Sequence, residues 1–475
     1  MPRPLTTERT RGKGPAPIDR RPERPPIVSR VAAIAALVFS TGALVAVVLL
    51  AGSHVGYLLA ALAAAALGLT ATWIAATNRR WRWWAAAAGA VLVGGAVASL
   101  VAAGRGVLAV LVVLLGIAIA SVLATAALQW EVRADLARRW REVPATRHGV
   151  AFMNPRSGGG KVTHLRLADE ARRRGVEPVL INHGDDLREL AETAVARGAD
   201  ALGMAGGDGS QAVVASVAAR HGLPFVCIPA GTRNHFALDL GIDRKNPVRA
   251  LDAFGPALAA TIDLGEVNGE VFVNNASMGV YGRIVASDEY RDAKRRTVAR
   301  LLPDLLGPDA TPFAFELDGP DGPIKGAELI EVSNNPYTLS SITGFGSRAR
   351  LDTARLGVTT VAVGGPLDVD RLVALEAAGH PERFEGWQDW TPMDLEVRAA
   401  GPVAAAVDGE SRQYDPPVRF RIRPAALEVR IARGQRGASP AFLRAPVSAS
   451  SLVGLAKVAC GRPSGIVPVR PADGS

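Results

Sequence analysis

Four apolar runs dominate the first third of the chain, and each is almost free of charged residues. At a rise of about 1.5 Å per residue, each run is long enough to cross a hydrocarbon layer of roughly 30 Å. A soluble helical bundle would need a polar outer face, and the pattern shows none. We therefore predict an α-helical membrane domain of four transmembrane helices within residues 31–130. The runs are Val31–Gly52, Val55–Ala76, Ala85–Ala103 and Val107–Gln129.

Arginines flank these runs unevenly. They are frequent in residues 1–30, in the loop 77–84 and after Gln129, whereas the other two loops offer only Arg105. Basic residues favour the cytoplasmic side, so we predict a multi-pass protein of the plasma membrane with both termini in the cytoplasm. Residues 1–30 are rich in Pro and Arg, which predicts a disordered basic tail. Apolar residues at helical spacing in Glu131–Val143 predict an amphipathic juxtamembrane linker over residues 131–147.

The pattern changes at His148, where short apolar runs begin to alternate with helical segments. This βαβ succession predicts an α/β domain with a parallel sheet over residues 148–243. Short strand-like runs then follow one another, interrupted by one helical insert at 284–306. They predict an antiparallel β-sandwich domain over residues 244–433, whose last two strands are expected at Val418–Ile422 and Leu427–Ile431. The remaining residues, 434–475, are rich in Gly, Pro, Ala and Ser and predict a flexible tail with a short helix near Ser451–Val458.

Three glycine-rich turns follow predicted strands of the α/β domain, and each precedes a helical segment. Glycines let backbone N–H groups approach an anion, and a helix N-terminus favours phosphate. Asp208 is unusual in such a place unless it binds a metal ion or accepts a proton; the alternative is a helix cap. The spacing therefore predicts a nucleotide site. Its candidate residues are Asn154, Ser157, Gly158, Gly159, Gly160, Lys161, Gly206, Gly207, Asp208, Gly209, Ser210, Gly231, Thr232 and Asn234.

These motifs, in this order, resemble those of the diacylglycerol kinase catalytic domain family, which includes bacterial lipid kinases and sphingosine kinases. Further matches lie at 274–279, at 333–335 and at Asp408-Gly409-Glu410, so the resemblance extends over about residues 149–431. It implies an ATP-binding α/β domain followed by a β-sandwich, with the active site between them and ATP and Mg²⁺ as cofactors. The four predicted membrane spans lie outside the resemblance.

The resemblance implies three catalytic carboxylates, Asp208, Asp408 and Glu410. A lipid hydroxyl must lose its proton as it attacks the γ-phosphorus of ATP, and a carboxylate can accept that proton. We favour Asp408 as the base, with Glu410 beside it, and Asp208 as the metal or water ligand. The reversed assignment stays open, and Asp-Gly is also a common hairpin turn.

Two departures from the family pattern bear on this interpretation. His235 replaces an Asp after the third turn, and Thr353 replaces an Asp that helps to hold a structural Mg²⁺ in some members. The second departure puts that ion in doubt.

The formal net charge of +9 admits either nucleic acid or a membrane surface as a partner. Because the basic residues gather beside the apolar runs, we expect anionic lipids of the inner leaflet and no nucleic acid. Two cysteines support neither a disulfide framework nor a cysteine-based zinc site. The sequence predicts an integral-membrane, ATP-dependent lipid kinase with a cytoplasmic kinase domain and a diacylglycerol-like substrate, and it leaves the oligomeric state open. The alternatives are a non-catalytic nucleotide-binding membrane sensor and an NAD-kinase-like enzyme acting on a soluble metabolite.

Overall fold

The computed structural model describes residues 24–51, 107–280, 313–338, 347–363, 381–443 and 449–464, with a few positions between 368 and 375. The chain divides into two compact units. Unit 1 comprises Met1–Glu131 with Pro446–Ile466, and unit 2 comprises Val132–Ala445 with Val467–Ser475.

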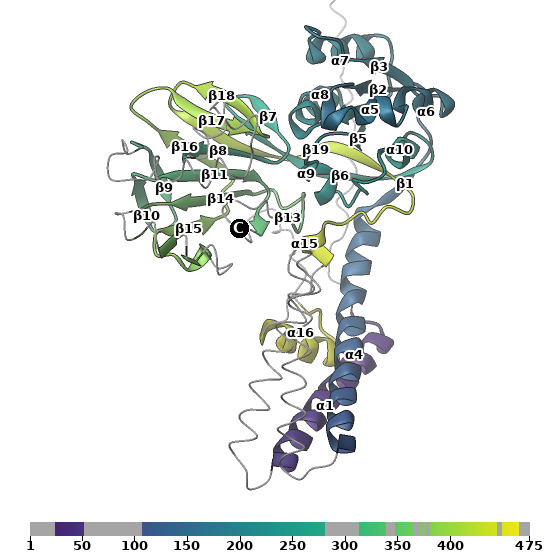
Figure 1. Ribbon diagram of the computed structural model, residues 1–475, viewed down its shortest axis with the longest axis vertical. Coiled ribbons are helices and arrows are strands. Elements are labelled where there is room, and N and C mark those ends of the chain that lie inside the picture. The colour runs from purple at the N-terminus through teal and green to yellow at the C-terminus, as the bar shows by residue number, and fades with distance from the viewer. Residues whose placement is uncertain are drawn as a thin grey trace, which may run out of the picture. The chain divides into compact units, whose positions relative to one another are not determined.

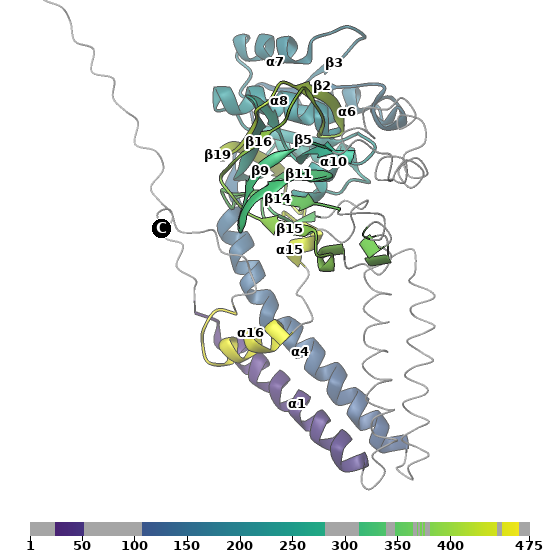
Figure 2. The same cartoon turned by 90° about the vertical axis from the view of Figure 1, so that its left-hand side faces the viewer.

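Unit 1 contains helix α1 (Ile27–Ala51), the first part of α4 (Val107–Arg139) and α16 (Ala449–Ala459). In Figure 2 the C-terminal helix α16 lies against α1. Small and branched apolar side chains fill the space between the three helices: Ala33, Ala127, Leu128, Leu455 and Val458. The buried carboxylate of Glu131 accepts a hydrogen bond from the backbone N–H of Ser464 at 3.0 Å, which fastens the segment after α16 to α4.

The structure does not support the prediction of four transmembrane helices. Within the described residues, one helix, Ile27–Val45, is long and apolar enough to cross a membrane, and α4 contains the shorter apolar stretch Val113–Leu128. The predicted spans Val55–Ala76 and Ala85–Ala103 lie outside the described residues. A membrane domain of four helices therefore stays a prediction.

The α/β part of unit 2 has the predicted parallel strands in the order β5-β4-β2-β3. Both faces of the inner strands are buried, which explains why they appear in the sequence as continuous apolar runs. Helices α5 to α8 lie around these strands (Figure 1). The elements are β2 (Gly149–Met153), α5 (Lys161–His164), α6 (Leu167–Arg173), β3 (Glu177–Leu180), α7 (Leu187–Ala196), β4 (Ala201–Gly206), α8 (Asp208–His221), β5 (Phe225–Pro229) and α9 (His235–Asp239).

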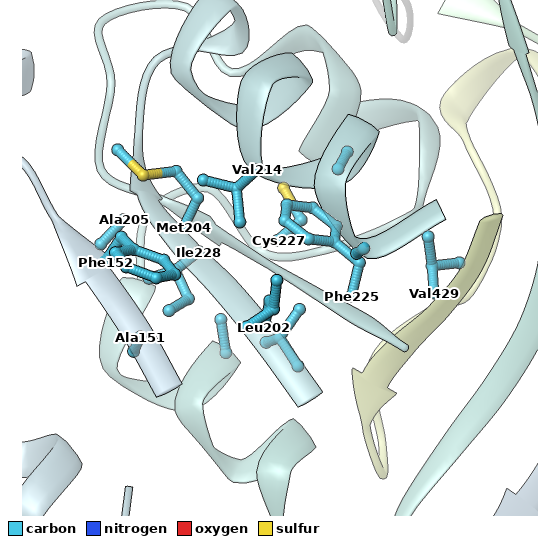
Figure 3. Packing of buried hydrophobic residues seen from close by; sticks show 14 of the residues in the cluster. Ala151, Phe152, Leu202, Met204, Ala205, Val214, Phe225, Cys227, Ile228 and Val429 are labelled. Carbon is cyan, nitrogen blue, oxygen red and sulfur yellow. The ribbon is translucent and has the colours of Figure 1, made fainter. Parts of the chain in front are cut away.

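The core of this part is formed by side chains from neighbouring strands and from α8. Figure 3 shows Phe152 of β2, Leu202 and Met204 of β4, and Phe225 of β5 packed together. Cys227 lies in the same cluster, and burial raises the pKa of its thiol well above the ordinary value. The free cysteine is therefore a core residue, as the apolar pattern around it indicates.

The predicted β-sandwich is present. However, the sheet of the α/β part does not end at the predicted boundary at residue 244 but continues into the sandwich. The 15-residue strand β19 (Val418–Ala432) pairs in parallel with β5 and antiparallel with β6 (Ala257–Val267). The α/β sheet thus continues through β19 to β16 (Asp394–Arg398), β9 (Glu316–Gly319) and β10 (Gly322–Lys325). This extended sheet supplies one layer of the sandwich.

The other layer is an antiparallel sheet of six strands in the order β15-β14-β11-β8-β17-β18. Apolar side chains from both layers form a second core that includes Phe272, Met278, Val358 and Phe420. The predicted helical insert at 284–306 lies outside the described residues. The strands are β8 (Asn275–Gly279), β11 (Leu329–Asn334), β14 (Leu356–Val361), β15 (Trp387–Trp390), β17 (Val403–Val407) and β18 (Glu410–Tyr414). Further elements of the described chain are η1 (Ser157–Gly159), α10 (Pro247–Ala250), η2 (Leu251–Phe254), β7 (Glu270–Phe272), β12 (Tyr337–Thr338), β13 (Ser347–Arg348) and η3 (Pro381–Arg383).

Two predicted segments differ from the structure. The amphipathic linker helix over Glu131–Val143 is wrong at its end, because α4 stops at Arg139 and residues Arg141–Val143 form strand β1, which pairs with β6. The flexible tail over 434–475 is also wrong for much of its length. Residues 434–439 and α15 (Pro440–Leu443) pack on unit 2, where Ala438 and Phe442 are buried. The predicted short helix is α16 in unit 1.

Candidate active site

The three glycine-rich turns lie at one edge of the parallel sheet. They follow β2, β4 and β5, and these strands pair directly with one another. The backbone N–H of Asn154 donates to the carbonyl of Ala205 at 3.0 Å, joining the first turn to the second. The Nζ of Lys161 donates to the carbonyl of Gly231 at 3.0 Å, joining the first turn to the third. The predicted convergence of the motifs is therefore present in the structure.

Glycine is required at two places where the turns touch. Gly158 has a φ of 57°, and a Cβ there would lie 2.2 Å from the carbonyl oxygen of Ala230. A Cβ on Gly231 would lie 2.5 Å from the Cα of Gly207. Any larger residue would force the turns apart.

Other positions leave space that a phosphate could fill. A Cβ built on Gly207 or on Gly159 would meet no described atom within 4 Å. Gly207 is the N-cap of the 14-residue helix α8, so the N–H groups of the first turn of that helix, which have no partner within the helix, lie next to this position. Ser210 is half-buried in the first turn of α8, and Thr232 is exposed in the third turn. We call these positions the phosphate cradle, because open glycines beside a helix N-terminus are an arrangement that binds anions.

Two predicted ligand residues form hydrogen bonds within their own turns, and their binding of a ligand stays a prediction. The amide of Asn234 accepts from the N–H of Gly231 and donates to the carbonyl of the same residue, both at 2.8 Å. Its backbone is left-handed, with a φ of 54°, and its side chain is buried. The Oδ1 of Asn154 accepts from the N–H of Arg156 at 3.0 Å. These two amides position the turns.

Asp208 stands at the start of α8 and connects it to α9. Its carboxylate accepts from the backbone N–H groups of His235 at 3.0 Å and Phe236 at 3.2 Å. Burial lowers the pKa of His235 to about 4, although the nearby Asp208 opposes that shift, so the imidazole is neutral near pH 7. A carboxylate has about four acceptor positions, so two remain for a ligand on Asp208.

Asp408 occupies the tight turn between β17 and β18. It has a φ of 48° and is followed by Gly409 at 84°, so the hairpin interpretation of Asp-Gly is confirmed. Its carboxylate accepts from the backbone N–H groups of Val273 at 2.8 Å, Asn274 at 2.7 Å and Asn275 at 3.3 Å. Desolvation raises the pKa of Asp408 to about 7, the backbone donors oppose that shift, and Asp208 adds to it.

Glu410 brings the sandwich hairpin against α8. Its Cγ lies 2.8 Å from the position that a Cβ on Gly209 would take, and its side chain is otherwise exposed. Glu410 thus contacts the residue next to Asp208, and Asp208 interacts electrostatically with Asp408, so three carboxylates that are separated by up to 202 positions in the chain lie in one region of the fold.

Two buried residues at this site escaped the sequence analysis. The Nε2 of Gln211 donates to the carbonyls of Met204 at 2.8 Å and Ile228 at 3.0 Å, which ties the ends of β4 and β5 together. The fully buried Arg348 binds the Asp239 carboxylate through its Nε at 2.7 Å. A Gln one turn into a helix and an Arg in a polar run carry no pattern that separates them from surface residues.

The residues present favour one magnesium position over another. The described residues contain no cluster of three or more His, Cys, Asp or Glu side chains that could enclose a metal ion. Mg²⁺ commonly binds one carboxylate together with substrate phosphates, and Asp208 beside the cradle fits that pattern.

The structural Mg²⁺ position near Asp352 and Thr353 does not fit a cation. The guanidinium of Arg350 donates to both Asp352 oxygens, each at 2.8 Å. The Oγ1 of Thr353 donates to the Oδ1 of Asn335 at 2.6 Å. A fixed positive charge therefore stands where the resemblance implied a metal ion.

Comparison with known proteins supports the interpretation of the motifs. Residues 148–267 match the family model of the diacylglycerol kinase catalytic domain. A protein of Pseudomonas fluorescens named "Probable lipid kinase YegS-like" is 36% identical over 276 residues, which are 56% of this chain and 90% of that protein. A "Diacylglycerol kinase" of Mycobacterium tuberculosis is 31% identical over 202 residues, 39% of this chain and 64% of that protein. The chain thus spans slightly less than two thirds of the mycobacterial relative.

A crystal structure of a diacylglycerol kinase from Bacillus anthracis aligns with 61% of this chain and 98% of its own, at 14% identity and a TM-score of 0.44.

Proposed function

Since the chain belongs to the diacylglycerol kinase catalytic domain family, we propose that it is an integral-membrane, ATP-dependent lipid kinase. It transfers the γ-phosphate of ATP to the hydroxyl of a diacylglycerol-like membrane lipid. The observation that carries this proposal is the convergence of three glycine-rich turns with Asp208, Asp408 and Glu410 at one edge of the sheet. When bound, ATP supplies the phosphoryl group, and Mg²⁺ supplies positive charge beside it.

Residues of the chain then bind the phosphates, hold the metal ion, accept the proton and orient the lipid hydroxyl. The N–H groups around Gly207 and the first turn of α8 bind phosphate oxygens, with Ser210 and Thr232 as hydroxyl donors. Asp208 keeps two acceptor positions open and holds the metal ion or its water. Asp408 has a pKa near 7, which suits a group that takes the proton from the lipid hydroxyl near neutral pH. Glu410 lies beside Asp208 over Gly209 and orients the hydroxyl.

We also propose that the chain is anchored by several membrane spans with the kinase domain in the cytoplasm. The apolar helix Ile27–Val45 supports an anchor, as does its exposed apolar surface at Val31, Ile34 and Val38. The arginines beside the apolar runs would bind anionic lipids of the inner leaflet. An anchored kinase meets a substrate that stays in the bilayer by searching a surface instead of a volume.

The test is a transfer assay with the full chain in vesicles that contain diacylglycerol, with γ-labelled ATP and Mg²⁺. We expect label in a lipid product. Asp408→Asn serves as the matched control, because it should bind ATP and yet transfer little label. Label in a water-soluble product after addition of soluble metabolites would favour an NAD-kinase-like enzyme. Nucleotide binding without transfer to any lipid would favour a sensor.

A further inference from the structure

Arg348 lies at the junction of four segments that border the active site. It belongs to the short strand β13 and is completely buried, with its guanidinium 5.1 Å from the centre of the Tyr337 ring. Its Nη1 donates to the carbonyls of Val273 at 2.6 Å and Asn334 at 2.8 Å, and its Nη2 to the Oδ1 of Asn274 at 2.9 Å. A buried arginine with this many partners is fixed in one geometry.

A single peptide group separates this guanidinium from the Asp408 carboxylate. Arg348 donates to the carbonyl oxygen of Val273, and the N–H of the same peptide, on Asn274, donates to the Oδ1 of Asp408 at 2.7 Å. The next peptide repeats the arrangement more loosely, with 3.5 Å on the arginine side and 3.3 Å on the aspartate side. Hydrogen bonds that share a peptide polarise one another, so the charge of Arg348 acts on Asp408 through this bond chain.

The other side of Arg348 reaches Asp208. The backbone N–H and the Nε of Arg348 both donate to Asp239, at 3.1 and 2.7 Å. Asp239 is the last residue of α9, and the first N–H groups of that helix donate to Asp208. Arg348 is thus connected to both candidate catalytic carboxylates, through α9 to one and through the peptide of residues 273 and 274 to the other.

We propose that Arg348 is a positioning residue for phosphoryl transfer, which fixes the peptide between Val273 and Asn274 against Asp408 and, through Asp239, fixes α9 against Asp208. This inference rests on the proposed function. It assigns a role in the reaction to a residue that lies behind the site.

The electrostatic consequence has a definite sign. Asp408 is faced by Asp208 of α8, by Arg348 of β13, and by Glu410 and Tyr414 of β18. Asp208 raises the pKa of Asp408 and Arg348 lowers it. Removing the guanidinium therefore raises the pKa of the proposed base. The rate of transfer depends on ionised Asp408. In the variant, the increase of this rate with pH should therefore occur at a higher pH than in the wild type.

The experiment compares two double variants of the full chain in vesicles. Arg348→Gln with Asp239→Asn removes both charges of the inner pair, so that no buried charge loses its partner. Arg350→Gln with Asp352→Asn is the matched control, because it removes a buried pair only two residues away that contacts α4 instead of the 273–274 peptide. We measure kcat against pH, KM for ATP and the melting temperature of each.

We expect the acidic limb of kcat to move upward by at most about 1 pH unit in the Arg348 variant, because the loss of the negative charge of Asp239 offsets part of the effect of losing the guanidinium, with KM for ATP nearly unchanged. In the Arg350 variant the limb should stay at the wild-type pH, although both variants melt at lower temperature. A folded Arg348 variant with an unmoved limb would overturn the proposal, as would equal shifts in the two variants.

If the Arg348 variant does not fold, Asn274→Ala decides the question. It removes one acceptor of the guanidinium and keeps the N–H that Asp408 accepts. We expect a smaller upward move of the limb, and an unchanged limb would again overturn the proposal. A wild-type chain that labels no lipid contradicts the proposed function itself, whereas an active wild type with unmoved limbs contradicts only the role of Arg348.

Discussion

Asp208 and Asp408 both accept backbone N–H groups, but from different loops and to different extents. Asp208 accepts two, from the start of α9, and Asp408 accepts three, from the loop between β7 and β8 and from the first residue of β8. Asp208 therefore has more free acceptor positions, as a metal ligand needs. Asp408 has the pKa near neutrality that a proton acceptor needs.

Replacing each carboxylate by its amide should separate these roles. Asp408→Asn removes the proton acceptor, so we expect kcat to fall by about a hundredfold or more with little change in ATP binding. Asp208→Asn should instead raise the Mg²⁺ concentration needed for half-maximal rate. The measurement is the rate as a function of Mg²⁺ concentration for both variants. Near-normal turnover in Asp408→Asn, together with an Asp208→Asn variant that is inactive at every Mg²⁺ concentration, would mean that Asp208 is the base.

Single residues were predictable from the sequence where a motif carried them. Asp208 and Asp408 belong to Gly-Asp-Gly and Asp-Gly-Glu elements, and the structure brings both to one site. Arg348 was not predictable, because its partners lie 14 to 109 positions away in the chain and no local pattern reports such contacts. Asn234 is predicted as a ligand, and in the structure its amide forms hydrogen bonds within its own turn. The sequence does not distinguish these roles, because an amide can serve in either one.

At the scale of elements, the phosphate cradle depends on a glycine beside which the fold leaves free space. Gly207 has an ordinary φ of −81° and no described atom within 4 Å of a built Cβ. The fold therefore tolerates a side chain there, and a bound phosphate does not. We expect Gly207→Asp to abolish ATP binding while the melting temperature changes little.

Gly401 offers the matched control for that variant. It lies in the turn between β16 and β17, and a Cβ there also meets no described atom within 4 Å. Gly401→Asp adds the same charge to the same fold away from the three turns, so its affinity for a nucleotide analogue should equal that of the wild type. Wild-type affinity in a folded Gly207→Asp variant would remove the second turn from the nucleotide site.

The element around Asp352 gives a prediction about metal removal. Because Arg350 occupies both oxygens of Asp352, we expect the melting temperature to be the same in EDTA and in millimolar Mg²⁺ when nucleotide is absent. Asp352→Asn should lower the melting temperature equally in both buffers, since it removes one of the two carboxylates, Asp352 and Asp135, that pair with the buried Arg350 guanidinium. A melting temperature that Mg²⁺ raises in the wild type but not in Asp352→Asn would show that this element binds the ion.

Strand β19 shows why element boundaries were harder to predict than elements. The sequence predicts two strands, at 418–422 and 427–431, and the structure has one strand with an irregularity between Arg423 and Leu427, where Ala425 has a φ of 50°. The Arg-Pro-Ala-Ala stretch at 423–426 resembles a turn in the sequence, but it is a bulge at which the strand changes from the sandwich to the α/β sheet. Pairing with β5 and β6 decides between two strands joined by a turn and one strand with a bulge. Those partners lie more than 150 positions earlier in the chain.

At the scale of the whole molecule, the sequence predicts the boundary between the two units near residue 130. It does not predict that the C-terminal segment 446–466 returns to unit 1. The predicted boundary after residue 130 agrees with the division between Glu131 and Val132. The return of residues 446–466 to unit 1 was not foreseen, because a short alanine-rich helix such as α16 could pack on many apolar surfaces. Its buried residues Leu455 and Val458 acquire their partners only in the folded unit.

Membrane topology is the prediction that concerns the whole molecule. Arginines gather in residues 1–30, in the loop 77–84 and after Gln129, so an even number of spans leaves both ends of the chain in the cytoplasm. A reporter fused after Arg30 or after Ser475 should therefore behave as cytoplasmic, and a phosphatase that is active only outside the cytoplasm should be active when fused at Ser53. A fusion at Asn78, in the arginine-rich loop, is the internal control and should be inactive with that phosphatase. An external signal from the Ser475 fusion would mean an odd number of spans; the four-span interpretation would then be wrong, and the kinase domain would lie on the side of the membrane that lacks ATP.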